Sequence, residues 1–166
     1  LEMPLDLLMN WADDAPPATA PQAAPRPGGD PVSVAAAAKL LAESERPMFI
    51  VGTQLRWSPR EGVVRRVADA WQAPFYLNGM ARGALPYEHP NLMTRSRKFA
   101  LSQADVCFVF GTPFDFRLDY GRALPASTKL VQVDLDGAEL GRNRRLDVAI
   151  HGDSGVVLEQ LLEAVP

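Results

Sequence analysis

Short, continuously apolar runs recur along this chain, separated by polar segments or by apolar residues at helical spacing. Such runs are typical of strands buried on both faces of a parallel sheet. The pattern predicts five strands, at residues 47–52, 74–78, 105–110, 129–134 and 147–151. Strands alternating with helices predict the α/β class: a Rossmann-like open parallel sheet of five to six strands with helices on both faces, a three-layer sandwich.

Helix signals lie between these runs, where a capping residue precedes apolar positions on one helical face. Four helices are predicted. The first is capped by Asp30 or Ser33 and runs to about Ser44, and the second begins at Ser58 and Pro59. The third is a short helix over 96–102, and the fourth is capped by Asp153.

The first part of the chain has a different composition. Residues 1–10 lack the basic region and the small-residue cleavage pattern of a signal peptide. Residues 11–31 are rich in proline and alanine, and proline fixes φ and removes a backbone donor, so this segment is predicted to be an extended linker. The chain does not start with methionine, and we expect it to be a piece of a longer polypeptide with its globular domain at 32–166.

Composition narrows the class of protein. A length of 166 residues with 47% hydrophobic residues suits one buried core, and no apolar run approaches the ~20 residues that span a bilayer. The net charge of −3 gives no reason to expect nucleic acid or an anionic membrane as a partner. The single cysteine, Cys107, excludes an intrachain disulfide and a cysteine-based metal cluster, and we expect it to pack in a strand of a cytoplasmic protein.

Polar residues follow the predicted strands at their carboxyl ends, the edge where parallel sheets bind ligands. Gly111 opens a loop rich in Thr, Asp and Arg. Asp134 follows about twenty residues later, at the spacing where such sheets place an acid that accepts hydrogen bonds from ribose hydroxyls. Arg82 and Arg117 are candidates for a phosphate or an adenine face. Alternatively, Asp115 and Arg117 bond only the backbone of their own loop. No nucleophile–base pair, P-loop or metal-spaced histidine is found, so the isolated chain is predicted to be non-catalytic.

Four ordered segments closely resemble the central domain of thiamine-diphosphate enzymes of the acetolactate synthase group. These segments are Arg46–Gly52, Gly79–Pro86 with His89-Pro90, Gly111–Arg117, and Val131–Asp136 with Glu139–Asn143. Residues 1–10 resemble the tail of the preceding pyrimidine-binding domain, with Leu1–Asp6 as its last strand, and residues 11–31 resemble the interdomain linker.

The resemblance implies a parent enzyme, a transferase or lyase, that forms or breaks carbon–carbon bonds of 2-oxo acids with thiamine diphosphate and Mg²⁺. Flanking pyrimidine- and diphosphate-binding domains would hold both across the subunit interface of a homo-oligomer. The central domain is non-catalytic; it holds FAD in acetolactate synthases, ADP in some relatives and nothing in others. The residues that match its nucleotide-contacting motifs are Gly52, Arg82, Gly111, Thr112, Asp115, Arg117, Asp134, Leu135 and Asp153.

One departure from the family pattern follows the first strand. FAD-binding members carry two or three glycines there, whereas Gly52 is followed by Thr53, Gln54, Leu55, Arg56 and Trp57. Side chains at these positions obstruct the close approach of a diphosphate. Trp57 either fills part of a vacated pocket or packs at a helix start. The sequence leaves open an FAD site, an ADP site, a regulatory or structural module, and a vestigial empty site.

Overall fold

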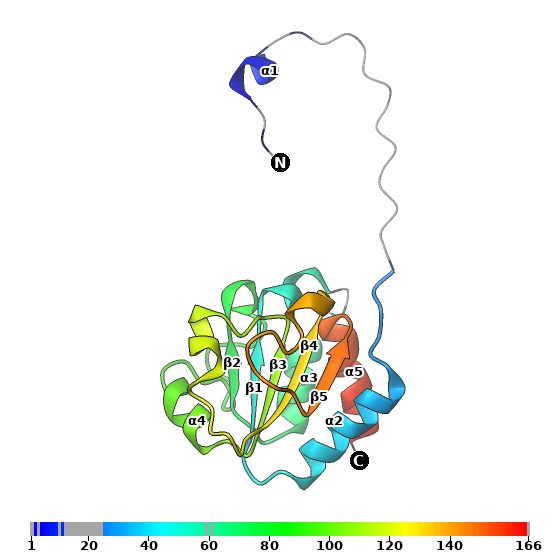
Figure 1. Ribbon diagram of the computed structural model, residues 1–166, viewed down its shortest axis with the longest axis vertical. Coiled ribbons are helices and arrows are strands. Elements are labelled where there is room, and N and C mark those ends of the chain that lie inside the picture. Colours follow the sequence, from blue (N-terminus) through cyan, green and yellow to red (C-terminus); the bar gives the residue numbers. More distant parts are fainter. Residues whose placement is uncertain are drawn as a thin grey trace.

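A five-stranded parallel sheet forms the centre of the protein (Figure 1). The computed structural model describes residues 25–58, 60 and 62–165, together with 2, 4–9 and 11. The strand order is β2-β1-β3-β4-β5, and every neighbouring pair is parallel. This arrangement confirms the predicted α/β, Rossmann-like fold. The strands are β1 (Pro47–Val51), β2 (Phe75–Leu77), β3 (Val106–Phe110), β4 (Lys129–Asp134) and β5 (Val148–His151).

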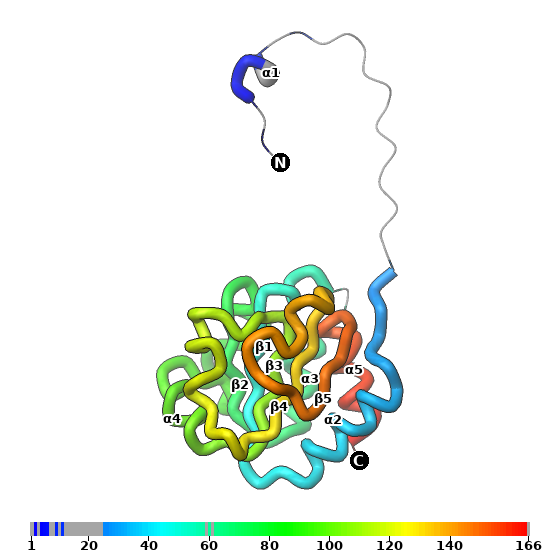
Figure 2. The backbone as a smooth tube through the Cα atoms, viewed as in Figure 1, coloured from blue at the N-terminus to red at the C-terminus, as the bar shows by residue number. Residues whose placement is uncertain are grey.

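The two faces of the sheet are covered differently. Helices α2 (Pro31–Glu43), α3 (Val63–Ala70) and α5 (Ser154–Ala164) pack on one face, and Figure 1 shows α2 and α5 side by side. The other face has α4 (Arg97–Gln103) and the long loop between β3 and β4, whose backbone can be followed in Figure 2 and whose apolar side chains pack on this face. Within the described residues, no helix is long and apolar enough to cross a membrane.

A row of stacked phenylalanines holds the three strands at the β2 edge together. Phe49 of β1 is paired in register with Phe75 of β2 and with Phe108 of β3. The ring centroids of Phe49 and its two partners are 4.6 Å and 4.8 Å apart, and all three side chains are fully buried. Stacked aromatic pairs on one sheet face add to the stability that burial alone provides. This row supports the register of β1 against its two neighbours, β2 and β3.

Cys107 lies in β3, on the face opposite the phenylalanine row, and is buried. Burial disfavours the thiolate and raises the pKa of the Cys107 thiol to about 12. The predicted packing role is therefore confirmed, because a thiol with this pKa is inert at neutral pH.

Two of the predicted helix caps are confirmed. The Asp30 carboxylate accepts a hydrogen bond from the Ser33 amide at 2.9 Å, and α2 begins at Pro31. The Asp153 carboxylate accepts from the amides of the first turn of α5.

The predicted helix start at Ser58 is wrong. Helix α3 begins at Val63, after Gly62 with a φ of 70°, a left-handed conformation that glycine adopts readily. The Ser58 hydroxyl donates to Asp153, with 2.5 Å between the oxygens, and accepts from the Arg60 amide at 3.4 Å, ahead of the helix. Pro59 lies outside the described residues.

The N-terminal part also departs from expectation. Leu5–Met9 form a short helix, α1, where the last strand of a preceding domain was expected at Leu1–Asp6. The sequence Leu-Asp-Leu-Leu-Met contains strong helix formers, and no described strand lies beside it to pair with. Residues 12–24 of the expected linker lie outside the described residues. Its end is part of the folded body, since the Gly29 amide donates to the Gln160 side chain at 2.7 Å.

The carboxyl ends of β1 and β3 approach so closely that Gly52 has no room for a side chain. A Cβ at Gly52 would lie 2.4 Å from the Gly111 carbonyl oxygen and 2.5 Å from the Cβ of Thr112. We predict that Gly52→Ala destabilises the protein by roughly 1–3 kcal/mol because the backbone must shift. Gly137 is the matched control, since a Cβ there meets open space, and Gly137→Ala should change stability by less than about 0.5 kcal/mol. Urea unfolding of both variants measures the difference; equal losses would contradict the prediction.

Candidate functional site

The connections of the sheet define where a ligand site is expected. The chain leaves β1 through α3 on one face, reaches the edge strand β2, and returns to β3 through α4 on the other face. The order of strands therefore reverses between β1 and β3. In open α/β sheets, the crevice beyond the carboxyl ends of two such strands is the usual ligand site. Gly52 and Gly111, both predicted site residues, stand at this point.

The side chain of Gln54 fills this crevice. Gln54 belongs to a short 3-10 helix, η1 (Thr53–Trp57), that follows Gly52 directly. Its Nε2 donates to Asp134 Oδ1 at 2.6 Å, and its Oε1 accepts from the Leu135 amide at 3.1 Å. A Cβ placed on Gly111 would lie 2.6 Å from the Cβ of Gln54. At both glycines, protein atoms thus occupy the space where a side chain would begin, and the Gln54 side chain covers Gly111.

Asp134, the expected ribose-binding acid, is enclosed by the protein. The residue is 0% exposed, and its Oδ1 also accepts from the Asp136 amide at 2.8 Å. Burial raises the pKa of the Asp134 carboxyl, and the hydrogen bonds from Asp136 and Gln54 oppose this only in part. Its Oδ2 has no hydrogen-bond partner among the described residues. Asp134 therefore serves the connection between η1 and β4, and a ribose cannot reach it in this arrangement.

Asp153 is also occupied by structural contacts. Its Oδ1 accepts from the amides of Gly155 and Val156 at 3.0 and 3.1 Å and from the Ser58 hydroxyl. Its Oδ2 lies 3.8 Å from the guanidinium of Arg26. These contacts confirm the predicted helix cap, and the role of Asp153 toward a ligand stays a prediction.

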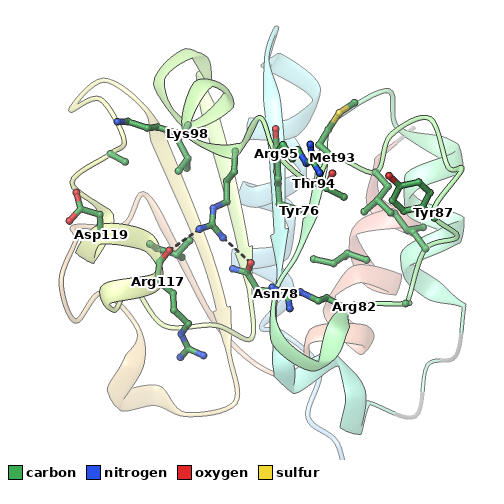
Figure 3. Close-up of a pocket in the computed structure, with 18 of the residues that line it drawn as sticks. Tyr76, Asn78, Arg82, Tyr87, Met93, Thr94, Arg95, Lys98, Arg117 and Asp119 are labelled. Atoms are coloured by element: carbon green, nitrogen blue, oxygen red, sulfur yellow. Dashed lines mark hydrogen bonds between the residues drawn. The ribbon is translucent and has the colours of Figure 1, made fainter.

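The two predicted phosphate-binding arginines lie apart from this crevice. Arg82 and Arg117 line a separate pocket of about 990 Å³ beyond the end of β2 (Figure 3). The Arg117 Nε lies 3.0–3.1 Å from both carboxylate oxygens of Asp115, whose Oδ1 also accepts from the Arg117 amide at 2.9 Å. The hydrogen bonds from Arg117 hold the pKa of Asp115 below its usual range. Asp115 and Arg117 therefore bond each other within their loop, and only the bond from the Arg117 amide to Asp115 is of the backbone kind that the alternative interpretation predicted.

The predicted site residues are thus divided into two groups. Gln54, which the sequence marks only as an obstruction, fills the crevice beside the first group, at the strand ends. Trp57 has neither expected role, because its side chain is 59% exposed on η1. Within the described part of the chain, no three His, Cys, Asp or Glu side chains lie close enough to hold a metal ion. The first group, at the strand ends, consists of Gly52, Gly111, Thr112, Asp134, Leu135 and Asp153.

The buried carboxyl of Asp134 predicts a pH-dependent stability. Because its pKa is raised in the folded state, the folded protein binds the proton more tightly than the unfolded chain does. Stability should therefore rise as the pH falls through the folded pKa toward the ordinary aspartate value of 3.8. Asp134→Asn, which does not titrate, should lack this gain. The measurement is the free energy of unfolding of both proteins from pH 7 to about 4; parallel curves would show that the carboxyl is not perturbed.

Comparisons with known proteins agree with this architecture. The family model described as thiamine pyrophosphate enzyme, central domain, matches residues 34–161. An acetolactate synthase large subunit of Mycobacterium tuberculosis is 34% identical over 139 residues, which are 84% of this chain and 25% of that protein. The 2-hydroxyacyl-CoA lyase 1 of Mus musculus is 36% identical over 135 residues, covering 79% of this chain and 23% of the lyase.

Solved structures have the same fold. Benzoylformate decarboxylase from Polynucleobacter necessarius aligns with a TM-score of 0.71 at 22% identity, over 98% of this chain and 32% of the decarboxylase. A thiamin diphosphate-dependent enzyme from Mycobacterium smegmatis aligns with a TM-score of 0.72 at 21% identity, over 91% of this chain and 31% of the enzyme. The chain spans about a quarter of the length of the curated relatives that it matches. By its sequence match over residues 34–161, the chain belongs to the family of thiamine pyrophosphate enzyme central domains.

Proposed function

We propose that this chain is the non-catalytic central domain of an enzyme that forms or breaks carbon–carbon bonds of 2-oxo acids with thiamine diphosphate. Relatives of this domain include an acetolactate synthase, a 2-hydroxyacyl-CoA lyase and the oxalyl-CoA decarboxylase of Escherichia coli. When bound, thiamine diphosphate would supply a nucleophilic ylid carbon and an electron-accepting ring, which together let a former carbonyl carbon carry negative charge. We assign its binding, and that of Mg²⁺, to flanking pyrimidine- and diphosphate-binding domains of the same polypeptide in a cytoplasmic homo-oligomer.

The closed crevice at the strand ends carries the structural part of this proposal. Gln54 occupies the space next to Gly111 and donates to Asp134 Oδ1, so the acid that would meet a ribose is enclosed by the protein, although its Oδ2 has no partner among the described residues. Of the possibilities that the sequence leaves open, we therefore propose the vestigial site: this domain does not hold FAD or ADP between β1 and β3. Its edge serves instead as a rigid support for the neighbouring domains.

The closed crevice predicts that FAD has no binding mode at the strand ends. The chain is titrated with FAD and binding is followed by flavin fluorescence anisotropy. No binding with a Kd below about 1 mM should depend on Asp134. The comparison is made with Asp134→Asn, which removes the acid that would accept from the ribose and nearly keeps its shape. An FAD affinity that falls tenfold or more in Asp134→Asn would contradict the vestigial site.

The non-catalytic role predicts that the chain has no activity by itself. With thiamine diphosphate, Mg²⁺ and pyruvate, the chain should form no acetolactate, because the groups that activate the cofactor are assigned to other domains. A complete acetolactate synthase in the same assay is the positive control. Acetolactate produced by the chain alone would overturn the assignment of catalysis to other domains.

A further inference from the structure

A further pocket lies at the amino end of the sheet, away from the crevice and from the pocket beyond β2. All five strands run in the same direction, so their amino ends share the edge opposite the arrowheads in Figure 1. The pocket has a volume of about 620 Å³ and lies between the turn before β4 and the loop before β5. Most of the residues that line it are polar or charged: Ser127, Thr128, Lys129, Arg144, Arg145 and Asp147.

This amino-end pocket contains more positive than negative charge, although the net charge of the chain is −3. Asp147 is the only acid among its described lining residues, and both of its carboxylate oxygens are in use. Oδ1 accepts from Lys129 Nζ at 2.9 Å, and Oδ2 accepts from the Leu130 amide at 2.9 Å. Arg144 and Arg145 have no ion pair with any residue that the structure describes. Two guanidinium groups without an acid in one pocket create a positive potential that attracts anions.

The backbone holds Arg144 in a fixed position. Its Nη1 donates to the carbonyls of Gly121 and Leu124 at 3.0 and 3.1 Å, and its Nη2 donates to the Pro125 carbonyl at 3.2 Å. Its stem packs on the end of the 3-10 segment η3 (Phe116–Gly121), where a Cβ added to Gly121 would collide with it. The Arg144 Nε has no acceptor in the described part of the chain and is not one of its buried unpartnered atoms, so solvent reaches it. A guanidinium that is oriented in advance loses little freedom when it binds an anion.

Other donors of this pocket have no structural contact to explain them. The side chains of Arg145 and Ser127 are exposed and make no hydrogen bond with the described residues. Ser127 lies in a turn that the bond from the Thr128 amide to the Pro125 carbonyl closes at 3.2 Å. The amides of Ala126 and Ser127, within this turn, donate to no described backbone acceptor. Loop stability therefore accounts for Arg144 but not for the remaining donors.

We propose that the amino-end pocket binds a small polar molecule that carries a phosphate group. The tetrahedral oxygens of a phosphate can accept from guanidinium, hydroxyl and amide donors that approach from several directions, whereas a carboxylate has only two oxygens. The volume of about 620 Å³ is that of a small-molecule site and leaves room beyond the phosphate itself. Because the lining is mostly polar, a hydroxyl-rich body such as a sugar suits it better than an aromatic ring. This site goes beyond the function proposed above and does not rest on it.

The test follows the backbone amides of the chain by two-dimensional NMR during a titration with glucose 6-phosphate at constant ionic strength. The amides of Ala126, Ser127 and Arg145 should shift and reach saturation. Inorganic phosphate should shift the same amides but bind at least tenfold more weakly, because it fills only part of the pocket. Glucose 6-phosphate that binds no tighter than inorganic phosphate would overturn the sugar-like body, and succinate that binds as tightly as glucose 6-phosphate would overturn the phosphate.

Two exposed positions test the pocket without disturbing the bonds of Arg144. Arg145→Gln should weaken the binding of glucose 6-phosphate roughly tenfold, as expected for the loss of one charge-assisted contact. Ser127→Glu places a carboxylate beside the two arginines and should abolish the binding. Urea unfolding of both variants checks that the fold is kept, since each change lies on the surface.

Arg142→Gln is the matched control, because it removes one positive charge from the same loop but does not line the pocket. It should bind glucose 6-phosphate within about twofold of the unchanged chain. Equal weakening by Arg142→Gln and Arg145→Gln, or no saturable shift of the pocket amides, would overturn the proposed site. The FAD titration reports on the opposite edge of the sheet, and none of these variants changes Gln54 or Asp134. Failure here is therefore distinguishable from failure of the vestigial site.

Discussion

The close approach of the chain at Gly52 and Gly111 is the constraint on which the carboxyl edge of the sheet depends. The Gly52 amide donates to the Phe110 carbonyl at 2.7 Å, which extends the pairing of β1 and β3 beyond their last residues. The chain then turns at once into η1, and this places the Gln54 side chain over Gly111 and within reach of Asp134. Glycine is needed here because two backbone segments meet, and this requirement is independent of any ligand.

The same contact explains why a nucleotide pattern in the sequence does not imply a nucleotide in the protein. Asp134 accepts from Gln54, Asp153 caps α5 and receives the Ser58 hydroxyl, and Asp115 holds Arg117. Each acid stands at the end of a strand or the start of a helix, where unpaired backbone amides also need acceptors. A residue type that suits a ligand at such a position suits the protein's own backbone equally well.

The strands and the main helices were predictable because burial imposes its period on the sequence. The runs at 105–110 and 129–134 are apolar because β3 and β4 are covered on both faces, and Asp30 and Asp153 mark helix starts by their capping chemistry. The start of α3 was not predictable from Ser58, since the helix follows Gly62 in a left-handed conformation and Ser58 is bonded to Asp153, ninety-five positions further along the chain. The occupation of the crevice by Gln54 likewise requires the distance to Asp134, which no local pattern contains.

The basic pocket beyond the end of β2 was missed for a related reason. Arg95, Arg97 and Lys98 lie together in the sequence, but the other two cations, Arg82 and Arg117, come from the loop after β2 and from η3. Arg97 brings these elements together, because one guanidinium bonds both Asn78 and the carbonyl of Arg117. The contact has two effects: it ties the end of β2 to the loop after β3, and it fixes the Asn78 amide with its nitrogen unpaired.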